Sequence, residues 1–229
     1  MNSSKFLTIV LLGLASTSTV YAASFSYDHK YEDVSKAHTD ELKFGYDFES
    51  GIGVAAKLKF SPNDEKSGDA GVAFHDERWQ ETELGLSYSY DVNEKFSVEP
   101  GVTWSRKQDE YKYKPYLSMD YALTPNVDLS SRYRYEISDY SFKETKRVNR
   151  FDAGISRKFG AFEVGYTLTL YRANVELYNE RETDYEHAIE FKYKATKALT
   201  PFIELSNESV SKHTDQRQTE FEVGVKYKI

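Results

Sequence analysis

Basic side chains recur in this chain at a spacing of two residues, as in Lys112/Lys114 and Arg132/Arg134. In a β-strand, residues two apart point to the same face, so such pairs would form basic strips along a sheet. Ammonium and guanidinium groups bind carboxylates, and arginine can do so through two parallel hydrogen bonds. The pattern therefore favours anion binding. The residues that we expect to contact an acidic solute are Lys43, Lys57, Lys59, Lys112, Lys114, Arg132, Arg134 and Arg150.

The acidic residues and histidines give little indication of a catalytic site. Carboxylate pairs such as Glu81/Glu83 could serve a glycosidase, but a chain with 37 acidic residues contains such pairs by chance. The five histidines are scattered, and none lies in a hydrolase motif or an HExxH metal motif. We expect no enzyme activity, metal or cofactor, and a barrel hydrolase is the weakest alternative. The net charge of -7 argues against nucleic-acid binding.

The elements that would position the basic residues are β-strands. Apolar and polar residues alternate along the chain, as in residues 41–48, where Leu42, Phe44 and Tyr46 alternate with Glu41 and Lys43. A helix would scatter these charges around its axis, whereas a strand sorts them onto one face. The alternating blocks lie near residues 25–31, 41–48, 52–60, 81–90, 96–105, 111–122, 127–136, 150–157, 162–171, 186–194, 199–206 and 218–229.

Short turns and long polar loops alternate between these twelve blocks. An even number of strands with this asymmetry predicts an all-β fold, a transmembrane antiparallel up-and-down β-barrel of about 12 strands. Its short turns would be periplasmic and its longer loops extracellular. A secreted β-sandwich is the alternative, but it does not require such regular asymmetry. The expected turns are 49–51, 91–94, 123–126, 158–160 and 195–197, and the expected long loops are 61–78, 138–146, 173–183 and 207–216.

The first 22 residues predict a cleaved signal peptide rather than part of the barrel. Lys5 precedes an apolar stretch over residues 6–14, and Val20-Tyr21-Ala22 has the small-x-small pattern of a cleavage site. Residues 23–229 would then form the barrel in the bacterial outer membrane. Only the outward side chains of such a barrel meet hydrocarbon, so a hydrophobic fraction of 39% is sufficient. The 15% aromatic residues suit interfacial girdles at the strand ends.

The polar face of the strands is expected to line a lumen with segregated charge. Five of the basic residues fall on the sixth to eighth strands and three on the second and third, roughly across the lumen, while glutamates gather on the last three strands. Opposed basic strips would concentrate anions, and small inward residues such as Gly101 and Gly224 would keep space open. Two alternatives remain: the charges pair across strands and only solvate the lumen, or the loops close it and the barrel is structural or adhesive.

Four segments resemble the oligogalacturonate-specific porin family (KdgM type), which includes sialic-acid-conducting porins. They are FSVEPG (96–101), YKPY (113–116), SRYRY (131–135) and RQT…VGVKY (217–227), and the resemblance covers nearly the whole mature chain. It implies a monomeric twelve-stranded barrel that passes acidic sugars or their oligomers across the outer membrane. Arg132 and Arg134 match the family's RYR arginines, Lys114 stands where an arginine is frequent, and Lys59 matches a basic position on the third strand.

Four positions depart from the family pattern in three ways. Glu220 and Glu222 stand where a basic residue is common, Lys114 lacks the bidentate geometry of arginine, and the chain ends in Ile229 instead of an aromatic residue. The first two departures concern the ligand more than the fold, so another uronate oligomer or a sialic-type acid is an alternative to oligogalacturonate. The expected partners are outer-membrane lipid, acidic oligosaccharide solutes and the outer-membrane assembly machinery.

Overall fold

Thirteen antiparallel strands form one continuous sheet in the computed structural model, which describes residues 22–64 and 69–229. The predicted signal peptide lies outside these residues except for Ala22, where β1 begins. Among the described residues, no helix is long and apolar enough to cross a membrane. The strands are β1 (Ala22–Glu32), β2 (His38–Asp47), β3 (Ile52–Pro62), β4 (Glu77–Tyr88), β5 (Tyr90–Asn93), β6 (Phe96–Arg106), β7 (Glu110–Thr124), β8 (Val127–Tyr140), β9 (Lys146–Phe159), β10 (Phe162–Ala173), β11 (Thr183–Tyr193), β12 (Leu199–Ser209) and β13 (Arg217–Lys228).

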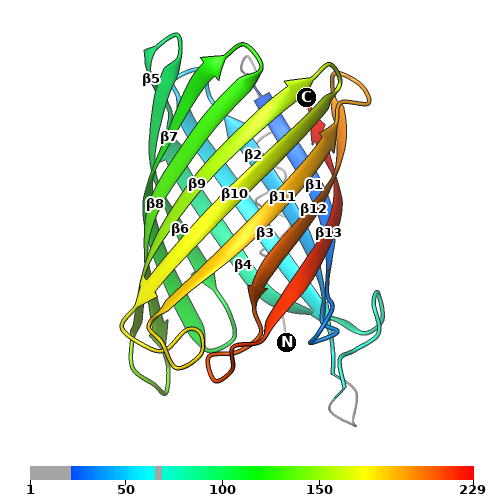
Figure 1. The fold of residues 1–229 in the computed structure, drawn as a ribbon, viewed down its shortest axis with the longest axis vertical. Coiled ribbons are helices and arrows are strands. Elements are labelled where there is room, and N and C mark those ends of the chain that lie inside the picture. The colour runs from blue at the N-terminus through cyan, green and yellow to red at the C-terminus, as the bar shows by residue number, and fades with distance from the viewer. Residues whose placement is uncertain (1–21, 65–68) are drawn as a thin grey trace, which may run out of the picture.

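The sheet closes on itself as a barrel (Figure 1). Each long strand pairs with its neighbours in the chain, and two pairings, β1 with β13 and β4 with β6, complete the ring. The twelve predicted blocks correspond to the twelve long strands. One short strand, β5, was not predicted as a separate element. It follows β4 after Ser89, and β4 and β5 both pair with β6. The predicted fold, an up-and-down barrel with a wall of about twelve strands, is confirmed.

Turns gather at one end of the barrel and long loops at the other (Figure 1). The long connections are residues 63–76, 141–145, 174–182 and 210–216, close to the predicted loops, and residues 33–37 and 107–109 form shorter connections at the same end. At the opposite end, Gly51 and Gly160 have φ of 86° and 63°, which glycine adopts without steric cost. The strand β1 begins and β13 ends at this short-turn end. The asymmetry is that of outer-membrane barrels, whose long loops are extracellular.

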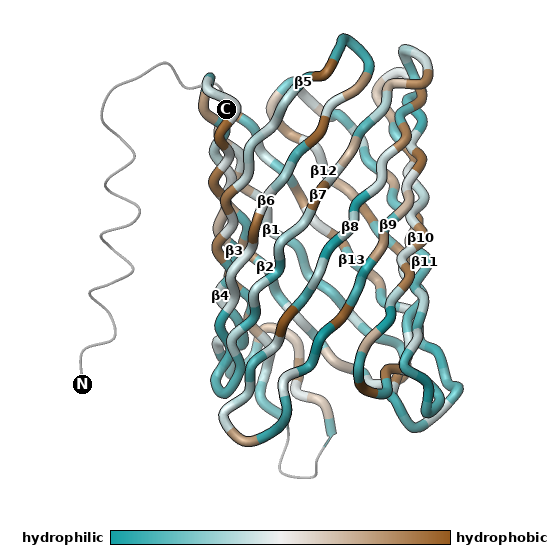
Figure 2. Tube along the Cα trace, turned by 90° about the vertical axis from the view of Figure 1, so that its left-hand side faces the viewer, coloured by the Kyte–Doolittle hydropathy of each residue, from teal (hydrophilic) through white to brown (hydrophobic). Residues whose placement is uncertain are grey.

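The distribution of polar and apolar side chains is the reverse of that in a soluble protein. Among the described residues, fourteen polar or charged side chains are buried, against only two apolar ones, Val148 and Ala173. Large apolar side chains such as Leu84 and Leu86 instead lie exposed on the outer surface, alternating along β4 with the inward Glu83. Figure 2 shows this alternation of hydrophilic and hydrophobic residues along the strands. The outer surface is therefore suited to hydrocarbon and the interior to water and ions.

Two inward glycines allow aromatic side chains of neighbouring strands to pack closely against the backbone. A Cβ at Gly101 would collide with the ring of Tyr116 on β7, and a Cβ at Gly224 would lie 2.5 Å from the ring of Phe202 on β12. Each ring covers the glycine on the neighbouring strand. The expectation that small inward residues keep the lumen open is therefore wrong at these two positions, because aromatic side chains fill the space.

The two faces of β12 predict opposite responses to one substitution. Ile203 is outward and 52% exposed near the middle of the strand, so Ile203→Arg should lower the free energy of unfolding in lipid vesicles by about 2–4 kcal/mol. The adjacent inward Glu204 lies in register between Glu190 and Glu222. Glu204→Arg places a positive charge between these two carboxylates and should lower the free energy of unfolding far less. Urea unfolding followed by tryptophan fluorescence measures both variants, and equal losses would contradict the assigned faces.

Candidate functional site: the charged lumen

Three arginines from adjacent strands meet near the middle of the barrel wall. Arg132 and Arg134 come from β8 and Arg150 comes from β9, all on the inward face, and Arg134 lies directly opposite Arg150 in the register. Two like charges in direct cross-strand opposition repel each other and require compensation. We call Arg132, Arg134 and Arg150 the arginine cluster.

One carboxylate, Asp152, holds two members of the arginine cluster. The Nε of Arg132 donates to its Oδ2 and the Nε of Arg150 donates to its Oδ1, both at 2.8 Å. Thr169 on β10 donates a further hydrogen bond to Oδ1, also at 2.8 Å. Asp152 is 6% exposed, so these partners offset the cost of burying its charge. Both arginines are bound through Nε, which leaves the outer Nη groups to contact a solute.

The positive charge of the third member, Arg134, is less well compensated by carboxylates. Its Nη1 lies 3.7 Å from Glu136, and its buried Nε has no hydrogen-bond partner among the described residues. Tyrosine rings flank the cluster: the guanidinium of Arg134 lies 5.9 Å from the ring of Tyr116, and that of Arg150 lies 5.3 Å from Tyr171. Within 4.0 Å, the three guanidiniums thus contact two carboxylates, Asp152 and Glu136, so the arginine cluster has more cations than carboxylates in direct contact.

The predicted lysines of β2 and β3 are in a different environment, because they form a network with acidic side chains. Lys43 lies 2.8 Å from Asp28 and 3.0 Å from Glu41, and Lys59 lies 2.9 Å from the other oxygen of Glu41. Lys57 lies 3.8 Å from Glu83. The charges of these lysines are therefore largely neutralised by neighbours on the wall.

The two lysines of β7 also lie beside carboxylates. Lys114 is 8% exposed and reaches across β6 to β4, where its Nζ donates to Glu83 at 2.5 Å and lies 3.8 Å from Glu81. Lys112 lies 3.5 Å from Glu110 on its own strand. The structure thus groups Lys112 and Lys114 with acidic partners, while the three arginines remain together. Of the eight predicted residues, the arginines form the cluster with excess charge.

Negative charge collects on the inward faces of β11, β12 and β13. Glu190, Glu204 and Glu222 lie side by side across these three strands. Lys30 on β1 lies 3.0 Å from Glu220 and 2.9 Å from Glu222, and Lys192 on β11 lies 2.5 Å from Glu190, so cations neutralise part of the group. We call Glu186, Glu190, Glu204, Glu208, Glu220 and Glu222 the acidic wall. Positive and negative charge therefore occupy different sectors of the barrel.

The sequence and fold comparisons agree with this architecture. A sequence model of the family "Oligogalacturonate-specific porin protein (KdgM)" matches residues 16–229. The chain belongs to this porin family. The oligogalacturonate-specific porin KdgM of Dickeya dadantii (strain 3937) is 29% identical over 97% of this chain and 98% of that protein. The N-acetylneuraminic acid outer membrane channel protein NanC of Escherichia coli (strain K12) is 22% identical over the full length of both.

The fold of this KdgM-family porin also matches a solved structure of NanC. That likeness has a TM-score of 0.74 at 19% identity and covers 90% of this chain and 100% of the NanC chain. Membership of the family and the twelve-stranded wall identify the chain as an outer-membrane porin, and its localisation in the bacterial outer membrane follows.

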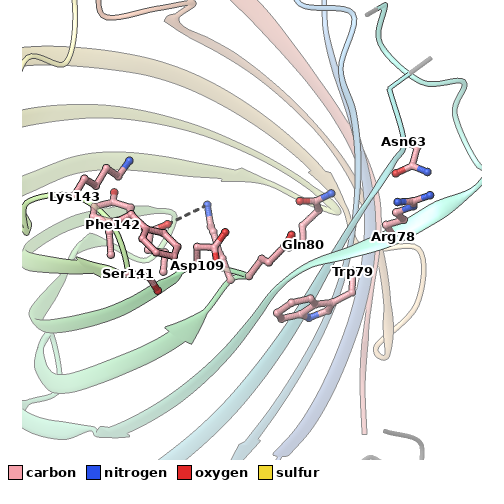
Figure 3. A pocket seen from close by; sticks show the side chains of 12 residues that line it. Asn63, Arg78, Trp79, Gln80, Asp109, Ser141, Phe142 and Lys143 are labelled. Carbon is pink, nitrogen blue, oxygen red and sulfur yellow. Dashed lines mark ion pairs between the residues drawn. The ribbon is translucent and has the colours of Figure 1, made fainter. Parts of the chain in front are cut away.

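A pocket of about 540 Å³ lies at the extracellular mouth of the porin (Figure 3). Its lining combines the cations Arg78, Lys107 and Lys143 with aromatic side chains that include Phe142, which is 91% exposed. Burial and the neighbouring charge of Lys112 lower the pKa of Lys107 in the β6–β7 connection. An anion in the pocket would favour the charged form of Lys107. A second hollow, of about 220 Å³, lies beside Arg132 and Arg150 inside the barrel.

Sequence reasoning missed the residues that tune the arginine cluster. Asp152 lies two residues after Arg150 and therefore on the same face, which is a signal that could have found it. Tyr116 and Tyr171 share the inward faces of β7 and β10, but nothing in their spacing indicates that their rings flank guanidiniums. Lys107 lies in a connection, where alternation gives no information about direction.

Asp152→Asn should increase the anion preference of the porin. The substitution removes the negative charge between Arg132 and Arg150 but keeps an acceptor for one of them. A unit charge at about 4 Å in water is worth about 1 kcal/mol, or about a fivefold change in local anion concentration. We expect the anion-to-cation permeability ratio, measured from reversal potentials in planar bilayers, to rise by up to about that factor. Asp128→Asn, which removes the partner of Lys158 near the short-turn end, is the matched control. A larger change in the control would contradict the prediction.

Proposed function

We propose that this porin is a passive channel for acidic oligosaccharides and that the arginine cluster is the lumenal site that binds their carboxylates. The observation that carries the proposal is the imbalance of three guanidiniums against two carboxylates in the middle of the wall. A site with excess positive charge in a narrow, partly desolvated lumen attracts anions. Guanidiniums bound through Nε keep planar donor pairs that suit a carboxylate.

The relatives support the chemical class of the solute. One is named for oligogalacturonate and the other for N-acetylneuraminic acid, and both compounds are sugars that carry carboxylates. In this chain, the mouth pocket offers cations beside aromatic side chains, a combination suited to the charged groups and apolar faces of an acidic sugar. A uronate oligomer entering there would pass from one basic group to the next.

The acidic wall would also orient the solute along this path. Carboxylates of a passing solute are repelled by Glu190, Glu204 and Glu222 and attracted to β8 and β9. Neutral hydroxyl groups can instead accept or donate hydrogen bonds along the glutamates. The departure from the family pattern at Glu220 and Glu222 is then a feature that fixes which edge of the sugar faces the arginine cluster.

The same proposal covers the remaining properties of the porin. The barrel closes through pairings within one chain, so one chain forms a complete barrel, and we infer a monomer that the outer-membrane assembly machinery inserts. The relatives are named as a porin and as a channel protein. We therefore infer passive transport without catalysis.

The double variant Arg132→Glu with Arg134→Glu tests the proposal. The wild-type protein in a planar bilayer should prefer anions, and trigalacturonate should reduce its current. The double variant should reverse the preference, because the change of four charge units turns the positive sector negative. Trigalacturonate should then no longer reduce the current.

Lys36→Glu with Lys197→Glu is the control with the same change in net charge, located in connections outside the strands. It should retain the wild-type selectivity and block. A wild-type channel that prefers cations and ignores trigalacturonate, N-acetylneuraminic acid and alginate oligomers would overturn the proposed solute class. Unchanged selectivity in the arginine variant alone would instead remove the arginine cluster from the path.

A further inference from the structure

A cluster of histidine and carboxylate side chains lies on the outer face of the β1–β2 hairpin, away from the lumen. His29 shares its face of β1 with Phe25, which is 48% exposed, and lies in register with Val223, which is 56% exposed. The inward residues of β1 have the other parity, as in Asp28. His38 begins β2, so the cluster lies toward the extracellular end. We call His29, His38 and Asp40 the outer histidine cluster.

The three side chains of this cluster form a chain of contacts. The Nδ1 of His29 lies 3.0 Å from Oδ1 of Asp40, and its Nε2 lies 3.2 Å from Nδ1 of His38. The hydroxyl of Tyr27 also donates to Asp40. Asp40 is 7% exposed, and its other oxygen, Oδ2, is buried without a hydrogen-bond partner among the described residues. A buried carboxylate with an unused oxygen keeps a strong negative potential beside the imidazoles.

The contact between His29 and His38 has the dimensions of a metal site. Zinc–nitrogen bonds are about 2.0–2.1 Å long, so two nitrogens at a tetrahedral angle lie about 3.3 Å apart. The observed separation of 3.2 Å is close to this value, and it is also the length of the hydrogen bond that joins the two rings without an ion. Since Nδ1 of His29 donates to Asp40, its Nε2 carries a lone pair directed at His38. A metal ion there replaces one shared proton, and His38 need only change tautomer.

We propose that His29 Nε2 and His38 Nδ1 bind a divalent transition-metal ion of the zinc class on the outer surface of the porin. Asp40 acts as the carboxylate that orients a metal-binding histidine and raises its basicity. Two imidazole nitrogens favour Zn²⁺, Cu²⁺ or Ni²⁺ over the oxygen-preferring Ca²⁺ and Mg²⁺. Water completes the coordination, as is usual in sites with few protein ligands.

The long loop between β3 and β4 lies against this site. The ring of Phe74 lies 4.6 Å from that of His29, and Glu77, the first residue of β4, interacts electrostatically with both Asp40 and His29. Binding would therefore connect the β1–β2 hairpin with the β3–β4 loop at the extracellular rim.

Zinc chloride titrated into the untagged, detergent-solubilised porin tests this site by isothermal titration calorimetry. We expect about one Zn²⁺ per barrel, with no binding of Mg²⁺ in the same range. His29→Gln and His38→Gln should each abolish the binding, and Asp40→Asn should weaken it by about 10–100-fold. His187→Gln is the matched control, because His187 is also on the outer face and hydrogen-bonds Tyr166 at 2.7 Å. That variant should bind like the wild type.

Two results would overturn the inference. The first is the absence of Zn²⁺ binding to a wild-type protein whose far-ultraviolet circular dichroism shows a folded barrel, which would leave the two histidines as a hydrogen-bonded pair only. The second is Zn²⁺ binding that survives both histidine substitutions but disappears in Glu208→Gln. Glu32, Glu208 and Glu220 bring one carboxylate oxygen each to within 4.8 Å of one another inside the lumen, and that result would assign the ion to them.

Discussion

The absence of water from the hydrocarbon core is the constraint on which this structure depends. Every backbone N–H and C=O group at that depth needs a partner within the protein, and a sheet satisfies this only if it has no edge. The pairings of β1 with β13 and of β4 with β6 remove the last edges. Closure then gives every strand one face toward lipid and one toward the lumen. The burial of charged side chains and the exposure of apolar ones follow from this geometry.

The lumen must in turn stabilise many charges in a confined space. Burying an unpaired charge costs several kcal/mol, so most inward charges need partners on the wall. The lysines meet this requirement through Glu41, Glu81 and Glu83, whose carboxylates lie on the same strand, a neighbouring strand or the next-nearest strand. The arginine cluster meets it incompletely, because Asp152 is shared between two guanidiniums. We therefore expect ion selectivity to arise where pairing is incomplete, so that the number of basic residues in the lumen is a poor guide to it.

The strands and turns could be predicted because alternation and turn residues are local signals. The alternation predicted the twelve blocks and their inward faces. The lengths of the connections predicted which end of the barrel carries the long loops. The break at Ser89 that separates β5 from β4 was not predictable, since it depends on pairing with β6. The partners of charged side chains were equally hidden: Lys114 bypasses its neighbouring strand to reach Glu83 on β4. Such contacts depend on register and side-chain reach, which one sequence does not specify.

The β1–β2 hairpin links the lumen to the outer surface through its register. Asp28 faces Lys43 inside the barrel, while the adjacent His29 faces Asp40 outside it. A shift of one residue in one strand would exchange these faces, moving Asp28 into lipid and the histidine into the ionic network. The ion pair between Asp28 on β1 and Lys43 on β2 opposes that shift. The charges that line the lumen therefore also hold the outer histidine cluster in its geometry, although the two sites lie on opposite faces of the same strands.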